Sequence, residues 1–261
     1  QMKAFAHLLD IMDEWREGCP WDREQTTESL RPLTIEETYE LSEAILASDD
    51  KNIAKELGDI LLHIVFYAKI GEEKGLFDIV DVIDMLCTKL VYRHPHVFSE
   101  TKVADAGEVI QNWEQLKTKE KDGNKTVLSG VPAHLPPLVK AYRMQDKARA
   151  VGFDWDKKED VWDKVKEEIG EFQTELQHLD TSNPDSVNKA QGELGDLLFS
   201  LVNASRLYDL NPDTALETTC LKFKNRFTYL ELAARKDGLT FADMSLEQMD
   251  KYWDEAKEKG L

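Results

Sequence analysis

Two acidic patterns with matching internal spacing stand far apart in this 261-residue sequence. The first is Glu36-Glu37-x-x-Glu40, followed by Glu56-Leu57-Gly58-Asp59, and the second is Glu167-Glu168-x-x-Glu171, followed by Glu193-Leu194-Gly195-Asp196. Residues three or four apart share one face of a helix, so each half of a pattern predicts carboxylates that project together. If the two helices of a pattern pack side by side, four or five carboxylates converge, and their repulsion favours a bound cation.

Carboxylate oxygens are hard ligands, which predicts Mg²⁺, with Mn²⁺ meeting the same preference. Mg²⁺ keeps several of its waters and is commonly bound together with substrate phosphates. A di-iron carboxylate site is the alternative from another enzyme class, but such sites use Glu-x-x-His motifs. Here the motifs are Glu-x-x-Glu and Glu-x-x-Asp. His63 follows Asp59 by one turn, where Ser200 follows Asp196, and it is either an extra ligand or a satisfied histidine at the bundle edge.

Cationic and aromatic residues follow each acidic pattern in the same order. The pairs are Lys89 with Arg93 and Lys222 with Arg226, and the second copy ends in Trp253 and Lys257. Two cations four residues apart share a helical face and can hold phosphate oxygens, and an indole ring offers a stacking surface for a base. Surface ion pairs and a core tryptophan are the plain alternatives. Taken with the acids, the set predicts a nucleotide site without a P-loop, because the Gly-x-x-x-x-Gly-Lys-Ser/Thr pattern is absent.

Helical periodicity dominates the sequence, and no segment is typical of a strand, so we expect an all-α protein. Pro32 is expected in the first turn of the helix that carries Glu36. In the following helix, Leu57, Leu61 and Ile64 belong to the expected apolar face, and the acids lie along its edge. The expected helices cover residues 4–15, 32–47, 50–73, 78–93, 105–121, 138–150, 158–179, 185–208, 213–236 and 246–258.

The order of motifs predicts a duplicated helical module. Trp21-Asp22 precedes the first acidic pattern and Trp155-Asp156 the second. We expect one module over residues 1–121, a Gly- and Pro-containing linker over 122–137, and a second module over 138–261. Cys19, Cys87 and Cys220 are too far apart for a metal or disulfide pattern, so reduced thiols are expected, with Cys87 and Cys220 as small core residues.

Charge and hydropathy exclude several classes of partner. A net charge of -18 argues against a nucleic-acid backbone or an anionic membrane as partner. No apolar run approaches the roughly 18 residues of a membrane span. The start, Gln1-Met2-Lys3, lacks the apolar core of a signal peptide, and together with the reduced thiols this favours a cytoplasmic location.

The doubled acidic pattern resembles the MazG family of nucleoside triphosphate pyrophosphohydrolases. The resemblance spans nearly the whole chain and extends to the segments 19–22 (CPWD), 93–98 (RHPHVF) and 151–155 (VGFDW). It implies helical bundles, usually dimeric, and Mg²⁺-dependent hydrolysis of a nucleoside triphosphate to the monophosphate and pyrophosphate. No dedicated base-reading motif is present, so broad nucleotide-pool house-cleaning is expected. The alternative is a non-catalytic helical dimer that senses nucleotide or binds a partner protein.

Site residues follow from the resemblance, in which the carboxy-terminal copy is generally the active one. It implies that the metal ligands are Glu168, Glu171, Glu193 and Asp196. It implies that nucleotide and phosphate contacts come from Lys222, Arg226 and Trp253, with Lys257 completing the set. We expect a water to be deprotonated near Glu167 or Glu168. The first copy forms a second candidate site, which we expect to contribute little to catalysis: Glu36, Glu37, Glu40, Glu56, Asp59, Lys89 and Arg93.

Overall fold

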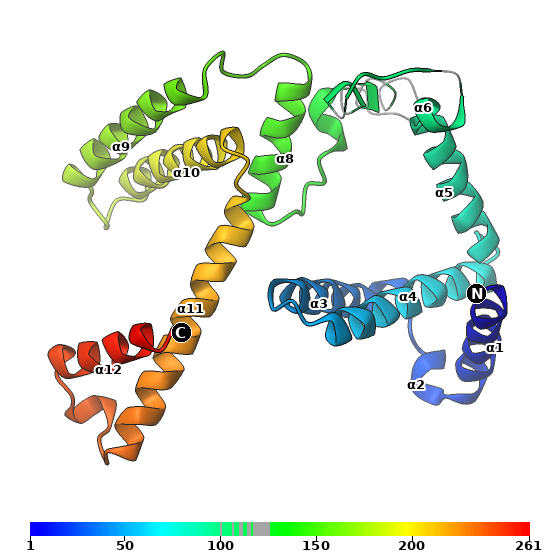
Figure 1. Ribbon diagram of the computed structural model, residues 1–261, viewed down its shortest axis with the longest axis horizontal. Coiled ribbons are helices and arrows are strands. Elements are labelled where there is room, and N and C mark those ends of the chain that lie inside the picture. The colour runs from blue at the N-terminus through cyan, green and yellow to red at the C-terminus, as the bar shows by residue number, and fades with distance from the viewer. Residues whose placement is uncertain (100, 106, 110–111, 114–115, 117–125) are drawn as a thin grey trace. The chain divides into compact units, whose positions relative to one another are not determined.

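Figure 1 shows the computed structural model, which describes residues 1–261 except 100, 106, 110–111, 114–115 and 117–125. The described residues form helices and contain no strand, which confirms the all-α prediction. They divide into two compact units, residues 1–102 and 103–261, and each is described by itself. The predicted helix at 105–121 lies largely outside the described residues, and so do the first four residues of the predicted linker.

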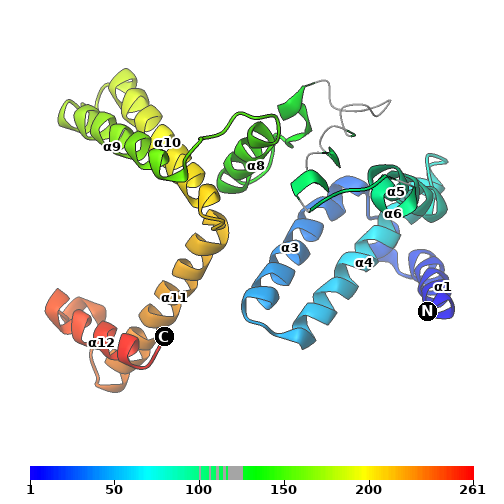
Figure 2. The ribbon, with the colours of Figure 1, turned by 45° about the horizontal axis from the view of Figure 1, so that its top comes forward.

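Unit 1 is built around a pair of helices, α3 (Thr27–Leu46) and α4 (Asp50–Glu73), which lie side by side in Figure 2. The other helices of unit 1 are α1 (Met2–Gly18), α2 (Pro20–Arg23), α5 (Ile79–Arg93) and α6 (Pro95–Phe98). The turn between α3 and α4 is short because Ser48 adopts a positive φ of 53° and Asp49 caps α4 by accepting from the Asn52 backbone N–H. This turn brings the two acidic segments of the first copy onto neighbouring helices.

The start of α3 differs from the prediction, which placed Pro32 in the first turn. The helix begins at Thr27 and Pro32 lies inside it. The reason is a capping box: the Thr26 hydroxyl accepts from the Ser29 backbone N–H at 3.2 Å, and the Ser29 hydroxyl accepts from the Thr26 N–H at 2.9 Å. Such a box satisfies two otherwise free donors and so favours a helix start at Thr27, five residues before Pro32.

The core of unit 1 lies between α1, α3 and α4. Its fully buried members are Met12, Leu30, Val65, Phe66 and Ile70, and Trp15 and Leu33 pack against them. Burying one such side chain stabilises the fold by about 1.5–3 kcal/mol. The corresponding core of unit 2 has fewer fully buried members.

Unit 2 repeats the helical pair as α9 (Val161–Gln177) and α10 (Pro184–Leu207), again side by side. Asn183 and Asn211 cap α10 and α11, and a proline follows each of them. Its core of Val161, Val165 and Ala204 is small. The remaining elements are η1 (Val127–Gly130), α8 (Pro137–Ala150), η2 (Lys158–Asp160), α11 (Pro212–Lys236), η3 (Phe241–Asp243) and α12 (Leu246–Glu258). Helix α8 packs on α10, and α11 packs on α12.

In the part of the chain that the structure describes, two apolar stripes are exposed, one on α4 and one on α10. They occupy matching positions of the repeat: Leu57, Leu61 and Ile64 in the first copy, and Leu194, Leu198 and Leu201 in the second. Each of these side chains is 39–53% exposed. Leu57, Leu61 and Ile64 thus share an apolar face, as predicted, but that face is exposed in the single chain, because the acidic edge of α4 turns towards α3 instead. Cys87 and Cys220 are also exposed, so their predicted core positions are wrong. Among the described helices, none is long and apolar enough to cross a membrane.

Candidate active site

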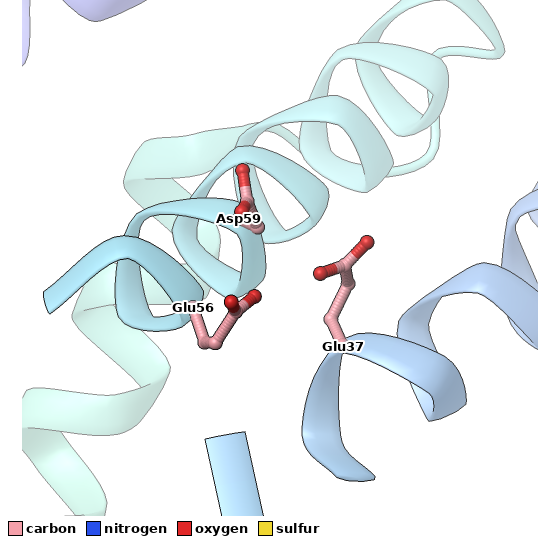
Figure 3. Close-up of side chains that lie close together, drawn as sticks. All are labelled: Glu37, Glu56 and Asp59. Atoms are coloured by element: carbon pink, nitrogen blue, oxygen red, sulfur yellow. The ribbon is translucent and has the colours of Figure 1, made fainter. Parts of the chain in front are cut away.

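Three carboxylates of the first copy meet between α3 and α4. Glu37 reaches from α3 towards Glu56 and Asp59 on α4 (Figure 3), and one oxygen of each lies within 4.8 Å of the other two. Glu56 is buried, with 5% of its surface exposed, while Glu37 and Asp59 are half-buried. We call this group the first acid triplet. The predicted convergence of two helical acid pairs is thus present, although Glu36 and Glu40 lie outside the triplet.

The second copy forms a second acid triplet with the same composition. Glu168 on α9 meets Glu193 and Asp196 on α10, again with ligand oxygens within 4.8 Å. By the repeat, these residues correspond one to one with the members of the first triplet. Glu167 and Glu171 lie outside it, although the Glu171 charge acts on Glu193. The two copies therefore bring corresponding carboxylates together, although the buried member is Glu56 in the first triplet and Glu168 in the second.

Electrostatic strain is present in both triplets. Burial, followed by repulsion from Asp59, raises the pKa of Glu37. Burial, followed by repulsion from Glu171 and Asp196, raises the pKa of Glu193. In addition, one buried oxygen of Glu56 and one of Glu168 have no hydrogen-bond partner. A buried acceptor without a partner is unfavourable by about 1–3 kcal/mol, and more when it is charged, so each triplet is short of positive charge.

The donor chemistry of the triplets fits a hard divalent cation. An ion with metal–oxygen distances of about 2.1 Å spans opposite oxygens about 4.2 Å apart, so small side-chain rotations would bring the carboxylates to one ion. Neither group contains a histidine, which disfavours the di-iron alternative. His63 lies outside the first triplet. It is buried, its Nδ1 has no hydrogen-bond partner, and burial lowers its pKa.

A lysine partly neutralises each triplet, but from different positions. Lys55 Nζ lies 2.8 Å from Glu56 Oε1 and 3.5 Å from Asp59 Oδ2. Lys164 Nζ lies 2.9 Å from Glu167 Oε1 and 2.6 Å from Glu168 Oε1. Hydrogen bonds to Glu168 and then Glu167 raise the pKa of Lys164, so it stays charged. Sequence reasoning missed both lysines, although Lys164 stands three and four residues before the acids that it contacts.

The predicted phosphate- and base-binding residues of the second copy lie on α11 and α12. Arg226 Nε donates to the Leu261 carbonyl at 2.6 Å, and its guanidinium lies 5.9 Å from the centre of the Trp253 ring. Lys222 is exposed, and Lys257 pairs with Asp254 at 2.9 Å. In the part of the chain that the structure describes, no hydrogen bond or ion pair joins these four residues to the second triplet. In unit 1, Lys89 is exposed on α5 and Arg93 ends that helix.

A cavity of about 670 Å³ opens beside the second triplet. Its lining includes Glu168, Asp196 and Lys164 as well as Gln145 and Asn203. Sequence reasoning singled out neither Gln145 nor Asn203. A smaller cavity of about 240 Å³ in unit 1 is lined by residues of α1, α4 and the start of α5 and contains no member of the first triplet. The larger cavity thus adjoins candidate chemistry.

The comparisons with known proteins agree with this geometry. A family model described as the MazG nucleotide pyrophosphohydrolase domain matches residues 25–98 and again residues 157–231. Each match contains one complete acid triplet. The chain therefore belongs to the MazG family, whose members are hydrolases acting on phosphoric anhydrides.

Full-length relatives support the assignment. The nucleoside triphosphate pyrophosphohydrolase/pyrophosphatase MazG of Thermotoga maritima is 42% identical over 97% of this chain and 95% of its own length. The nucleoside triphosphate pyrophosphohydrolase of Escherichia coli K12 is 38% identical over 100% of this chain and 99% of its own. The uncharacterized protein YabN of Bacillus subtilis is 46% identical over 97% of this chain, which spans 52% of that longer protein.

Proposed function

We propose that the chain hydrolyses nucleoside triphosphates to the monophosphate and pyrophosphate at the second acid triplet, in a reaction that depends on Mg²⁺. The observation that carries the proposal is the buried, unpartnered oxygen of Glu168, which belongs to a triplet that opens into a cavity of about 670 Å³. Family membership and the names of the full-length relatives support it. We assign it broad specificity and a house-cleaning role in the cytoplasmic nucleotide pool.

The residues that would hold the ion are Glu168, Glu193 and Asp196, with Glu171 beside them. When bound, Mg²⁺ supplies positive charge to the phosphate oxygens, and Mn²⁺ would supply the same. The buried position of Glu168 suits a ligand better than a base, because only 5% of its surface is open to the water from which a base would take a proton. All-carboxylate donors leave the choice between these ions to geometry and availability.

The chain's own side chains would accept the proton and bind the phosphates. Glu167 is the better placed of the two candidate bases, because its side chain is 56% exposed and can receive a proton from water. Lys164 holds that carboxylate at 2.9 Å and so fixes its direction. Lys222 and Arg226 would bind phosphate oxygens, with Trp253 and Lys257 beside them. Substrate binding or assembly has to bring α11 to the triplet.

We propose a homodimer held in part by the apolar stripes of α4 and α10. Stripes at matching positions of both copies favour an interface contributed by both halves, since an isolated surface leucine would not recur in register. A symmetric dimer pairs identical patches and would remove both stripes from water. We propose no nucleic acid and no membrane as partners, in keeping with the net charge of -18.

Light scattering should give about 60 kDa, twice the 29.9 kDa of one chain. Leu198→Asp should lower that mass towards the monomer, because it places a charge in the proposed apolar contact. The matched control is Leu246→Asp, at a leucine of α12 that is 73% exposed and lies outside both stripes. A mass of about 30 kDa for the unaltered protein at micromolar concentration would contradict the dimer.

Millimolar Mg²⁺ should raise the melting temperature, because an ion that binds only the folded state stabilises it in proportion to RT ln(1 + [L]/Kd). At a concentration of about 100 times Kd the gain is about 2.7 kcal/mol. The control is the double variant Asp59→Asn, Asp196→Asn, which removes one carboxylate from each triplet and should lose most of the shift. A melt that neither Mg²⁺ nor a chelator changes, with or without nucleotide, would count against both metal sites.

The proposed activity is tested by pyrophosphate release from the eight common ribo- and deoxyribonucleoside triphosphates with Mg²⁺. We expect turnover of several of them, with pyrophosphate rather than phosphate as the product. A protein that binds these nucleotides and turns over none of them would be a sensor rather than a hydrolase.

A further inference from the structure

Gln145 presents a buried hydrogen-bond acceptor without a partner. It lies on α8 with 7% of its surface exposed, and its Nε2 donates to the Phe199 carbonyl on α10 at 2.9 Å. A carbonyl can only accept, so this contact fixes which way the amide faces. Oε1 is therefore the atom left over, and it has no partner. Such an acceptor is unfavourable unless a ligand brings a donor to it.

Asn203 presents the complementary group in the same cavity. Its Oδ1 accepts from Arg206 Nη2 at 2.9 Å, and Arg206 is itself held by Asp154. Arg206 is only 3% exposed, so these contacts hold the Asn203 side chain in one orientation. With Oδ1 engaged, the amide nitrogen is the group that Asn203 can offer to a ligand. The cavity thus combines one fixed acceptor with one fixed amide donor.

Aromatic and acidic side chains also line this cavity. Trp155 and Phe199 line it together with Glu168 and Asp196 of the second triplet. Its volume of about 670 Å³ is typical of small-molecule sites. Aromatic faces suit a flat ring, and the carboxylates suit a cation that accompanies an anionic group. The matching ligand has a planar polar ring joined to phosphates.

The first copy serves as an internal control for these polar positions. In the register set by the acid triplets, Asn203 corresponds to Phe66, and Lys164 corresponds to Leu33. Phe66 is 2% exposed and belongs to the core of unit 1, and Leu33 packs against that core. Where unit 1 fills the space with apolar side chains, unit 2 keeps a polar cavity. The module can fold without polar residues there, so their presence calls for another explanation.

We propose that this cavity binds the nucleobase of the substrate, with Gln145 Oε1 accepting an N–H of the base and the Asn203 amide donating to it. The inference rests on the proposed hydrolysis at the second triplet. It adds a binding site for the base of the nucleotide. Every common base carries both an N–H donor and an acceptor, and a base in a pocket is held by such contacts and by stacking. One acceptor and one donor therefore position any base without selecting one, in keeping with broad specificity.

The test is calorimetric binding of two probes in the presence of Mg²⁺: an α,β-methylene nucleoside triphosphate and inorganic tripolyphosphate, which has no base. Gln145→Leu and the copy-one substitution Asn203→Phe should each weaken nucleotide binding by at least about tenfold, or about 1.4 kcal/mol. Tripolyphosphate binding should change by less than about twofold, because the triplet is untouched. The matched control, Gln177→Leu at the exposed end of α9, should change neither affinity.

Equal losses for both probes, or no loss for the nucleotide, would overturn the base site. The two variants are independent, and a thermal melt of each confirms folding before binding is measured. Because this experiment needs no turnover, the two proposals can fail separately. Nucleotide binding with the expected losses but without hydrolysis contradicts the proposed function alone. Hydrolysis with unchanged nucleotide affinity in both variants contradicts the base site alone.

Discussion

Asp196→Asn should lower the rate of pyrophosphate release by at least about a hundredfold, while Asp59→Asn should lower it by less than about tenfold. The two aspartates hold matching places in the two acid triplets, so the substitutions are chemically identical. Losing one carboxylate removes a ligand and part of the charge that holds the ion against the phosphates. The expected difference rests on the surroundings: the second triplet adjoins a cavity of about 670 Å³, whereas Phe66 and Leu33 fill the corresponding space in unit 1.

Glu171→Gln and Glu40→Gln give a second matched pair that lies just outside the triplets. Glu171 acts on Glu193 through its charge, as Glu40 acts on Glu37, so we expect a smaller but parallel asymmetry. Each variant is checked for its mass in solution, because loss of assembly would also lower the rate. If the variants of the first copy are inactive while those of the second still turn over, the assignment of the working copy is reversed.

The convergence of acids was predictable because it follows from local geometry. Glu193 and Asp196 are three residues apart on one helix, and the repeat places Glu168 on the preceding one. Only the pairing of adjacent helices has to be assumed, and short connections make that pairing common. Glu171 is likewise three residues from Glu168, yet it lies outside the triplet, so spacing along one helix does not by itself decide which carboxylates meet.

The cavity was not predictable from motifs, because it depends on packing between distant segments. Gln145 and Phe199 are 54 positions apart in sequence, and their contact exists only once α8 packs on α10. The signal that could have indicated it is a comparison of the two copies at non-acidic positions. Phe66 opposite Asn203 is a core residue opposite a polar one, and such a change is unexpected in a module that keeps its fold.

The apolar stripes show a different limit of sequence periodicity. A 3.6-residue period indicates that a helix has an apolar face, and it does so for Leu57 and Leu61 on α4. It does not tell whether the same chain or another one covers that face.

The domain boundaries at 121 and 138 stay a prediction, since residues 117–125 lie outside the described part of the chain.

Asp154→Ala should destabilise the protein by about 1–3 kcal/mol, because it leaves the buried guanidinium of Arg206 without its charged partner. Asp154 accepts two hydrogen bonds from Arg206, at 3.0 and 2.5 Å, and the side chains are 19% and 3% exposed. The loss is not larger because water still reaches Asp154. The measurement is chemical denaturation, with Asp156→Ala, at an exposed aspartate two residues later, as the control.

The pH dependence gives the same prediction a second test. Burial acts to raise the pKa of Asp154, but the hydrogen bonds and charge of Arg206 outweigh it and hold the pKa below its ordinary value. A carboxylate with a lowered folded-state pKa stabilises the fold above its unfolded pKa of about 3.9, and this contribution is lost as the pH falls through the folded value. The stability gap between the unaltered protein and Asp154→Ala should therefore be constant near neutral pH and shrink below about pH 4. A gap that is under about 1 kcal/mol at pH 7, or that widens in acid, would show that this ion pair does not anchor α10 to the segment before α9.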